Sequence, residues 1–133
     1  MHGSEIAEIL APIQDDMQRM DALLKRAMNS VVPLVGEINH HIISSGGKRL
    51  RPAVLLLAAR ACGHTGDEHL RLAAAIEAVH TATLLHDDVV DRSRLRRGRP
   101  TANQVWGNEA SVLVGDFMYS RATQMIVESE RLD

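Results

Sequence analysis

The stretch Asp67–Asp91, DEHLRLAAAIEAVHTATLLHDDVVD, contains no Gly and no Pro over its 25 residues. Its apolar side chains recur with helical spacing around most of the circumference, which predicts a long and largely buried helix. The stretch nevertheless ends in His86, Asp87, Asp88 and Asp91. Charged side chains on a buried helix are costly unless they are paired or bound to a cation. The rest of the chain is therefore expected to be organised around this helix.

The acidic end of this helix has the pattern of a metal site. Asp87 and Asp91 are four residues apart and share one helix face, roughly 6 Å apart along the axis at about 1.5 Å per residue. Two such carboxylates repel each other unless positive charge lies between them. Mg²⁺ prefers oxygen ligands and usually binds through carboxylates together with substrate phosphates. An acidic helix end without function is the alternative, but acids there oppose the helix dipole.

Arginines are clustered directly after the acidic end. They are Arg92, Arg94, Arg96, Arg97 and Arg99. Guanidiniums beside carboxylates can hold Mg²⁺ and a polyphosphate together. A nucleic-acid patch is the alternative, but no aromatic residue interleaves with these arginines. The formal net charge of −2 also argues against general affinity for nucleic acid or an anionic membrane.

A second cationic stretch, Gly46–Pro52 or GGKRLRP, places two glycines before three cations and a predicted helix start. Glycines let the backbone turn sharply, and the free N–H groups of the new helix could face an anion together with the cations. An ordinary helix–helix loop with solvated cations is an equal alternative. His80 lies on the Asp87 face of the long helix and is a plausible ligand contact, although a lone histidine is more often a core residue.

Composition limits the fold class. The 133 residues suffice for one domain, and 45% are hydrophobic while only 2% are aromatic. A core of Leu, Val, Ile, Ala and Met predicts an all-α protein. The single cysteine, Cys62, excludes an internal disulfide and is expected to pack in an apolar helix. With neither an 18-residue apolar run nor a signal peptide pattern, the sequence predicts a cytoplasmic protein without a transmembrane segment.

About five main helices are predicted in a single helical domain over residues 1–133. The first covers residues 6–31, with Pro12 either near its start or at a kink. The second begins at Pro33 and is ended by the stretch Ser44–Gly47. Besides the long helix, the others run from Pro52 to Gly63 and from Asn108 to about Arg131. The helix from Pro52 is apolar on nearly all sides and is expected to be central. Residues 92–107 are expected to form a loop with a short turn at Thr101.

The last predicted helix has its own expectations. Its inward-facing residues are expected to be Val112, Leu113, Phe117, Ala122, Met125 and Ile126. Gly115 is expected to allow a close helix contact, whereas no role follows for Asp116. The apolar sides of all five helices call for further partners, which a homodimer or sequence missing from this chain would supply.

Four stretches together resemble the trans-type polyprenyl diphosphate synthases, in particular the long-chain octaprenyl and decaprenyl group. They are GGKRLRP (46–52), EAVHTATLLHDDVVD (77–91), LRRGRPTAN (95–103) and WGNEASVLVGDFMYSRA (106–122). The resemblance covers about residues 30–127. Members of that family are about twice as long and carry a second aspartate-rich motif in their C-terminal half. No such second motif occurs here, so the chain resembles the N-terminal half of a synthase.

The resemblance implies the all-α isoprenoid synthase bundle and a Mg²⁺-dependent prenyltransferase that joins isopentenyl diphosphate to an allylic prenyl diphosphate, as a homodimer when complete. Residue roles follow from the matching positions. Lys48, Arg51, His80 and Arg97 would bind isopentenyl diphosphate, and Arg96 would bind the allylic diphosphate. Asp87 and Asp91 would bind Mg²⁺. The catalytic residues would be these two aspartates together with Asp88 and Arg96. A non-catalytic helical subunit or fragment that binds diphosphate or a partner synthase is the alternative.

Product length is expected to depend on the residues one turn before Asp87, which are Ala82 and Thr83. The growing prenyl tail would run along the long helix, and no Phe, Tyr or Trp precedes Trp106. A large ring at residue 82 or 83 would fill the tunnel, because packed interiors do not yield space readily. In the family, such rings are associated with short products. The resemblance therefore implies long products.

Overall fold

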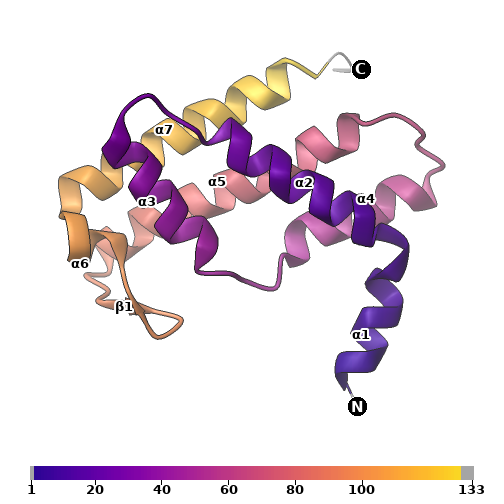
Figure 1. Ribbon diagram of the computed structural model, residues 1–133, viewed down its shortest axis with the longest axis horizontal. Helices are drawn as coiled ribbons and strands as arrows, with labels where there is room; N and C mark the ends of the chain where they lie inside the picture. The colour runs from indigo at the N-terminus through magenta and orange to yellow at the C-terminus, as the bar shows by residue number, and fades with distance from the viewer. Residues whose placement is uncertain (1, 130–133) are drawn as a thin grey trace.

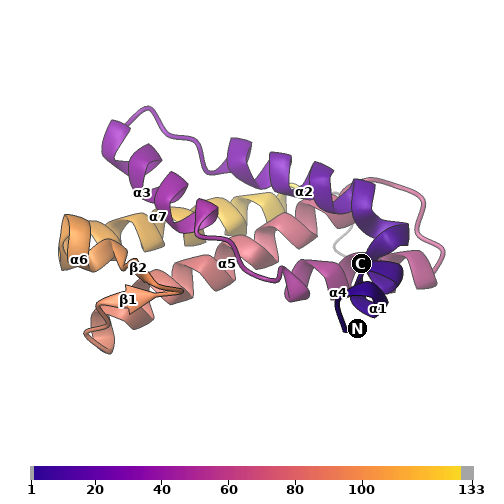
Figure 2. The same ribbon diagram turned by 60° about the horizontal axis from the view of Figure 1, so that its bottom comes forward.

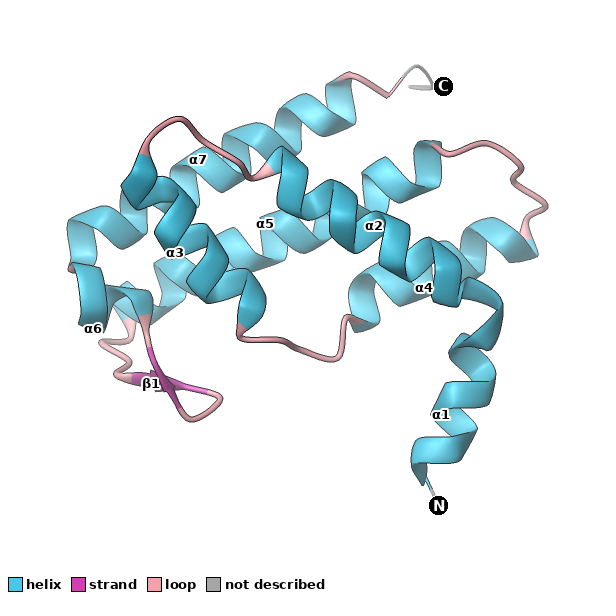
Figure 3. Ribbon diagram, in the orientation of Figure 1, coloured by secondary structure: helices cyan, strands magenta, loops and turns pink. Residues whose placement is uncertain are grey.

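The computed structural model describes residues 2–129 and is built almost entirely from helices (Figures 1 and 3). Five helices in this part have twelve residues or more, which confirms the all-α class and the predicted number of main helices. They are α2 (Gln14–Ala27), α3 (Pro33–Ser44), α4 (Leu50–Ala61), α5 (Glu68–Val90) and α7 (Asn108–Val127). The shorter elements are α1 (His2–Leu10), a 3-10 turn η1 (Ala11–Ile13), β1 (Leu95–Arg96), β2 (Arg99–Pro100) and α6 (Ala102–Trp106).

Helix α5 is the centre of the bundle, as its sequence predicts. It packs most extensively against α7 and also against α2 and α4 (Figure 1). Its packed sides are lined by alanines with at most 1% exposure: Ala73, Ala74, Ala75, Ala78 and Ala82. These small side chains let neighbouring helices approach closely, and Leu70 and Leu85 complete the buried surface.

Helix α4 departs from its prediction in two ways. It begins at Leu50, so Pro52 occupies the first turn, where proline is tolerated. It is also peripheral: Ala53 and Leu56 are buried, while Val54 is 65% exposed. The central placement is therefore wrong for the described residues, because the helix meets its neighbours on one side only. Cys62, expected to pack in an apolar helix, is instead exposed just past the helix end.

The N-terminal segment bends at Pro12, which confirms the kink among the two alternatives. The chain changes there from α1 through η1 to α2, because proline lacks an N–H group and clashes with the preceding turn. Helix α1 projects away from the bundle (Figures 1 and 2). Ile6 is accordingly 53% exposed and Ile9 60%, while Val31 lies beyond α2 and is 99% exposed. These three residues do not join the core.

Helix α7 begins at Asn108, the predicted start of this helix, and Gly107 is its N-cap. It ends at Val127, and the predicted end at Arg131 lies outside the described residues. The inward face is only partly as predicted. Ala122 and Met125 are buried and Phe117 packs against the core, but Val112, Leu113 and Ile126 are 38%, 68% and 38% exposed. Val114 and Met118 are buried instead, because apolar residues surround the helix and only its packing against α5 selects a side.

Gly115 allows α7 to approach α5 closely, as predicted. A Cβ atom at this position would lie 2.4 Å from Nε2 of His86. The same nitrogen lies 3.1 Å from the carbonyl oxygen of Val112 and 3.3 Å from Oδ1 of Asp116. His86 thus takes the space of the missing side chain, and Asp116, to which the sequence assigned no role, is its partner.

We expect Gly115→Ala to destabilise the chain, because the new methyl group must displace the His86 ring. Overpacking of this kind costs about 1–3 kcal/mol, which exceeds the gain of about 0.5–1 kcal/mol from replacing a helical glycine. Gly36→Ala on α3 is the matched control, since nothing lies within 4 Å of its added Cβ. Urea unfolding followed by circular dichroism should show Gly36→Ala stabilised and Gly115→Ala destabilised. Equal shifts in both variants would contradict the packing argument.

None of the helices within residues 2–129 is long and apolar enough to cross a membrane.

Candidate functional site

A β-hairpin follows α5 where the sequence predicted a loop (Figure 2). Leu95 pairs with Pro100 and Arg96 with Arg99. The two turn residues, Arg97 and Gly98, have φ angles of 52° and 75°. Positive φ at both positions is the requirement of a type I′ turn, whose twist matches that of the strands. The hairpin was missed because an arginine at the first turn position is not a usual signal for positive φ.

The hairpin is tied to α3 and α6 by polar contacts. The carbonyl oxygen of Ser93 accepts hydrogen bonds from Oγ1 of Thr101 at 2.8 Å and from Nδ2 of Asn103 at 3.0 Å. The carbonyl oxygen of Pro100 lies 2.9 Å from Nε2 of His41. These contacts fix the arginine-rich hairpin against α3 and α6.

Arg96 and Asp88 form a bidentate ion pair. Nε and Nη2 of Arg96 donate to the two carboxylate oxygens of Asp88 at 3.0 and 2.6 Å, and the Asp88 side chain is only 4% exposed. The hydrogen bond to Asp88 is the main reason why the pKa of Arg96 is raised. Asp88 therefore turns away from the exposed side of α5 and orients the guanidinium. The sequence identified both residues but not their pairing.

Asp87 and Asp91 both lie exposed at the end of α5. Within residues 2–129, neither carboxylate has an ion-pair partner, and no group of three or more His, Cys, Asp or Glu is arranged to hold a metal ion. Two carboxylates on one helix face still suit Mg²⁺, because this ion keeps several waters and completes its shell with phosphate oxygens. The donor atoms present thus fit the ion that the sequence predicts.

A cavity of about 590 Å³ lies between the loop after α3, the start of α4, the middle of α5 and the hairpin tip. We call it the cationic pocket. Its lining includes all four residues expected to bind isopentenyl diphosphate: Lys48, Arg51, His80 and Arg97. Gly47, Arg49, Leu50 and Glu77 complete the lining. Residues from three separate stretches of sequence therefore meet in one place.

Two contacts shape the cationic pocket. Nη1 of Arg51 lies 3.2 Å from Nε2 of His80, and Nη1 of Arg97 donates to the carbonyl oxygen of Gly46. Gly47 has a φ angle of 143°, and a Cβ on it would lie 3.0–3.2 Å from the Arg97 guanidinium. Glycine is required here because of both its backbone conformation and this close approach. The glycine-rich stretch therefore forms part of the wall of the cationic pocket.

The pKa of His80 lies below its ordinary value of 6.5. Partial burial is the main cause, and the positive charge of Arg51 is the next; Glu77 opposes the shift, while Arg97 and Arg96 add to it. Its imidazole is thus neutral at pH 7, and the positive charge of the cationic pocket comes from Lys48 and the arginines.

The polyprenyl synthetase family model matches residues 32–133. The chain belongs to the polyprenyl synthetase family. It is 52% identical over 126 residues to the octaprenyl diphosphate synthase of Escherichia coli K12, a match that covers 95% of this chain and 38% of that protein. It is 51% identical to the geranyl-diphosphate-specific all-trans-nonaprenyl-diphosphate synthase of Rhodobacter capsulatus, covering 94% of this chain and 39% of that protein. The chain thus spans about two fifths of the length of these relatives.

Solved structures of polyprenyl synthases have the same fold. A decaprenyl diphosphate synthase from Rhodobacter capsulatus matches with a TM-score of 0.90 and 48% identity, over 94% of this chain and 39% of that one. A polyprenyl synthase from Caulobacter crescentus CB15, complexed with calcium and isoprenyl diphosphate, also has a TM-score of 0.90, with 45% identity over 93% of this chain and 38% of that one. The helices described above are therefore those of the isoprenoid synthase fold.

The structure of this polyprenyl synthetase chain separates the two residues expected to control product length. Ala82 is buried with 1% exposure, whereas Thr83 is exposed on the side of α5 that carries Asp87. Ile76, which is 39% exposed, lies two turns before Thr83 on the same side, and Val79 is half-buried between them. We call these three residues the open strip of α5. Thr83 is thus exposed along this strip, whereas Ala82 is packed inside the bundle.

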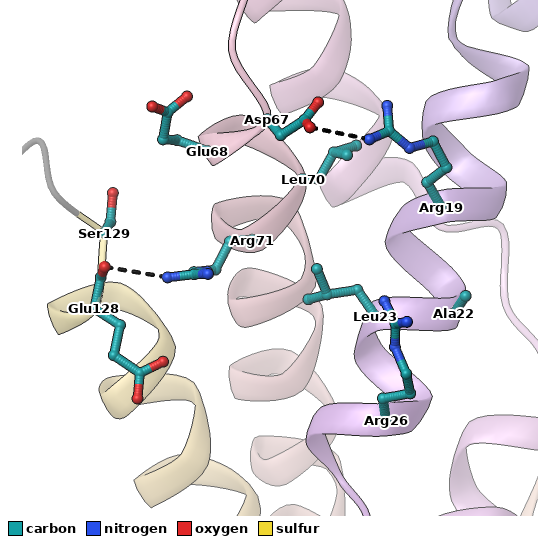
Figure 4. Close-up of a pocket in the computed structure, with 10 residues that line it drawn as sticks. All are labelled: Arg19, Ala22, Leu23, Arg26, Asp67, Glu68, Leu70, Arg71, Glu128 and Ser129. Carbon is teal, nitrogen blue, oxygen red and sulfur yellow. Dashed lines mark hydrogen bonds and ion pairs between the residues drawn. The ribbon is translucent and has the colours of Figure 1, made fainter.

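A second cavity, of about 600 Å³, lies at the opposite end of α5 between α2 and α7 (Figure 4). Its lining contains three arginines and three acids: Arg19, Arg26, Arg71, Asp67, Glu68 and Glu128. Nη2 of Arg19 lies 3.1 Å from Oδ2 of Asp67, and Arg71 donates to the carbonyl oxygen of Glu128 at 3.1 Å (Figure 4). This cavity lacks the excess of positive charge that the cationic pocket has, so we do not assign it a diphosphate.

Proposed function

We propose that this chain is the N-terminal part of a polyprenyl synthase domain and carries its isopentenyl diphosphate pocket and its first metal-binding carboxylates. The reaction would be the Mg²⁺-dependent condensation of isopentenyl diphosphate with an allylic prenyl diphosphate. The meeting of Lys48, Arg51, His80 and Arg97 in the cationic pocket is the observation that carries the proposal. His80 and Asp87 lie on one face of α5, so the two halves of the site are neighbours.

In this proposal the cationic pocket binds a diphosphate through charge-assisted hydrogen bonds. Arg51 and Arg97 offer planar guanidiniums that can bind phosphate oxygens in pairs, and Lys48 adds a point charge. The Caulobacter crescentus relative supports this assignment, because its crystal structure is a complex with calcium and isoprenyl diphosphate. The binding of the same two kinds of ligand by this chain remains our proposal.

The chemistry proposed for the acidic end of α5 is ionisation of the allylic diphosphate. Asp87 and Asp91 would hold Mg²⁺, which when bound neutralises negative charge on a departing diphosphate. Arg96, oriented by Asp88, would add a fixed positive charge for the same oxygens. The carbon–oxygen bond of the allylic diphosphate breaks, the double bond of isopentenyl diphosphate attacks the allylic carbon, and a proton is then lost. The open strip of α5 would form part of the apolar wall that excludes water.

We also propose that a homodimer forms when the synthase is complete. Leu113 is 68% exposed and Val127 65%, and both lie on α7. These exposed apolar side chains leave room for a partner on α7, which a second copy of the synthase or the rest of its own chain would supply. Sedimentation of a complete protein that contains this part would test the dimer, and a monomer at micromolar concentration would contradict it.

Calorimetry on the purified chain tests the metal and diphosphate sites. We expect weak Mg²⁺ binding alone and much tighter binding when inorganic diphosphate is present, because two carboxylates leave most of the octahedral shell to water and phosphate. Asp87→Asn combined with Asp91→Asn should remove the effect of Mg²⁺, and Asp116→Asn is the control on a different helix. Tight Mg²⁺ binding to the chain alone would contradict the proposal, as would unchanged diphosphate binding in Lys48→Ala and Arg51→Ala.

The pKa of His80 should rise when a diphosphate occupies the cationic pocket, because nearby negative charge favours the imidazolium. In the free chain the lowered pKa has a cost: as pH falls below 6.5, the unfolded state takes up a proton before the folded state does, so stability falls. NMR titration of the His80 ring with and without inorganic diphosphate measures the shift. Urea unfolding at pH 7.5 and 5.5 should show a smaller loss in His80→Gln than in the unchanged chain. A His80 pKa that diphosphate leaves unchanged would place the ligand elsewhere.

A further inference from the structure

We propose that Arg49 is a positioning residue that neutralises Glu77 inside the cationic pocket, and that this pair sets how strongly the pocket binds a diphosphate. The inference rests on the proposed function, since it concerns the same pocket. It adds Glu77, to which the sequence patterns assign no role, and it gives Arg49, one of the three cations of the glycine-rich stretch, a role other than contact with an anion.

Arg49 is turned inward between two cations that line the same cavity. It has a φ angle of 53° and occupies the N-cap of α4, between Lys48 and Arg51 in the sequence. A left-handed conformation is uncommon for a residue other than glycine and directs the side chain away from the course of its neighbours. The Arg49 side chain is only 17% exposed. Its guanidinium is therefore placed for contacts within the protein.

The contacts of Arg49 reach three helices. Nη1 donates to Oε1 of Glu77 on α5 at 2.8 Å, and Nη2 donates to Oδ1 of Asp21 on α2 at 3.2 Å. Nη2 also lies 3.4 Å from the carbonyl oxygen of Ile43 on α3. Asp21 in turn lies 3.0 Å from Nζ of Lys25 and lines a different cavity, so only the Glu77 contact belongs to the cationic pocket.

Among the described residues, Glu77 is the one acid in the lining of the cationic pocket. Its side chain is 10% exposed, so its charge is poorly screened by water. An unpaired carboxylate here would repel a diphosphate and would also be costly to bury. The ion pair with Arg49 offsets both effects, and leaves Lys48, Arg51 and Arg97 as the charges that a ligand meets.

A simple structural clamp is the competing account of Arg49. If the residue only fastened the glycine-rich loop to the bundle, its two acidic partners would be equivalent, and removing either would weaken the pocket to a similar extent. If instead Glu77 must be neutralised, removing Glu77 and removing Asp21 have different effects on diphosphate binding, because only Glu77 lies in the pocket.

The test is a double-mutant cycle on the full 133-residue chain, with inorganic diphosphate and Mg²⁺ as the probe in calorimetry. Glu77→Gln should tighten binding about 3- to 10-fold, because it removes a repulsive charge and keeps the shape of the side chain. Arg49→Gln should weaken binding about 10-fold or more, and the double variant should return to within about 3-fold of the unchanged chain. Asp21→Asn is the matched control and should change the affinity less than about 2-fold.

Titration of His80 by NMR provides a second readout that needs no ligand. Glu77 raises the pKa of His80 against the arginines, so Glu77→Gln should lower that pKa further. Arg49→Gln should raise it, and the double variant should cancel the rise. Thermal unfolding of each variant checks the fold, and Glu77→Gln carries the test if Arg49→Gln does not fold.

Three results would overturn the inference. Two of them concern binding: a double variant that binds diphosphate as poorly as Arg49→Gln, and weaker binding in Glu77→Gln than in the unchanged chain. The third is a His80 pKa that is the same in Glu77→Gln, Arg49→Gln and the double variant as in the unchanged chain, which would contradict the claim that Arg49 neutralises Glu77. If the unchanged chain does not bind diphosphate, the proposed function is wrong, and so is the claim that the Arg49–Glu77 pair sets the diphosphate affinity. The His80 titration needs no ligand and still decides whether Arg49 neutralises Glu77.

Discussion

The purified 133-residue chain is expected to show no condensation of isopentenyl diphosphate with an allylic diphosphate, even at saturating Mg²⁺. Within residues 2–129 the proposed metal site has two carboxylates, Asp87 and Asp91, and no group of three or more His, Cys, Asp or Glu is arranged to hold a metal ion. The open strip of α5 is also exposed to water, so an allylic cation would be unprotected. Loss of charge stabilisation worth roughly 4 kcal/mol already slows a reaction about a thousandfold.

Incorporation of radiolabelled isopentenyl diphosphate measures this directly. The informative comparison joins the chain to the C-terminal remainder of a relative, such as the Escherichia coli octaprenyl diphosphate synthase, and repeats the assay. Activity should appear in the joined protein and disappear again in its Asp87→Asn, Asp91→Asn variant. Turnover by the chain alone would refute the prediction. A joined protein that folds but stays inactive would favour the alternative, a helical subunit that binds diphosphate or a partner synthase without catalysis.

The second large effect concerns product length. A complete enzyme with this N-terminal part is expected to make products longer than geranylgeranyl diphosphate, and Thr83→Phe is expected to shorten them. Thr83 is exposed on the open strip, and the other two residues of the strip, Val79 and Ile76, lie farther from Asp87 and are not aromatic. A phenyl ring at residue 83 would block the path of a growing tail, because packed walls do not yield space readily.

Ala82→Phe is also expected to shorten products, but its effect is less direct. Ala82 is 1% exposed, so the ring must push aside packed neighbours before it can reach the strip, at a cost of about 1–3 kcal/mol. Thr83→Val is the control, since it keeps the size of the side chain. Chromatography of the dephosphorylated products decides the matter. Unchanged products in both phenylalanine variants, or short products from the unchanged enzyme, would show that the tail does not run along this strip.

Local pattern was sufficient for the framework of the fold. The apolar spacing of residues 67–91 predicted the central helix to within one residue at each end, since α5 runs from Glu68 to Val90. Proline and glycine predicted the start of α3 at Pro33 and the end of α4 before Gly63, because both residues restrict the backbone without help from the rest of the chain. The four residues expected to bind isopentenyl diphosphate were instead taken from the matching positions of the family that the sequence resembles, and the fold brings all four into the cationic pocket.

The tertiary structure decided which side of each apolar helix is buried. Helices α4 and α7 carry apolar residues around their whole circumference, so periodicity alone could not show that Val54 and Leu113 are exposed. For the same reason the sequence placed Ala82 and Thr83 together, although packing against neighbouring helices buries only Ala82.

The pairing of charges was likewise decided only in three dimensions. Sequence spacing placed Asp87 and Asp91 on one face of α5 but gave no partner for Asp88, which is buried against Arg96 while Asp87 is exposed. Arg49 looks like one more cation of the glycine-rich stretch, but its left-handed backbone turns it toward Glu77, which is 28 residues away in the chain. Sequence spacing determines which residues share a helix face. The partner of a charged side chain depends on which other helix the fold brings within about 3 Å of it, and that distance is set by the packing of the whole bundle.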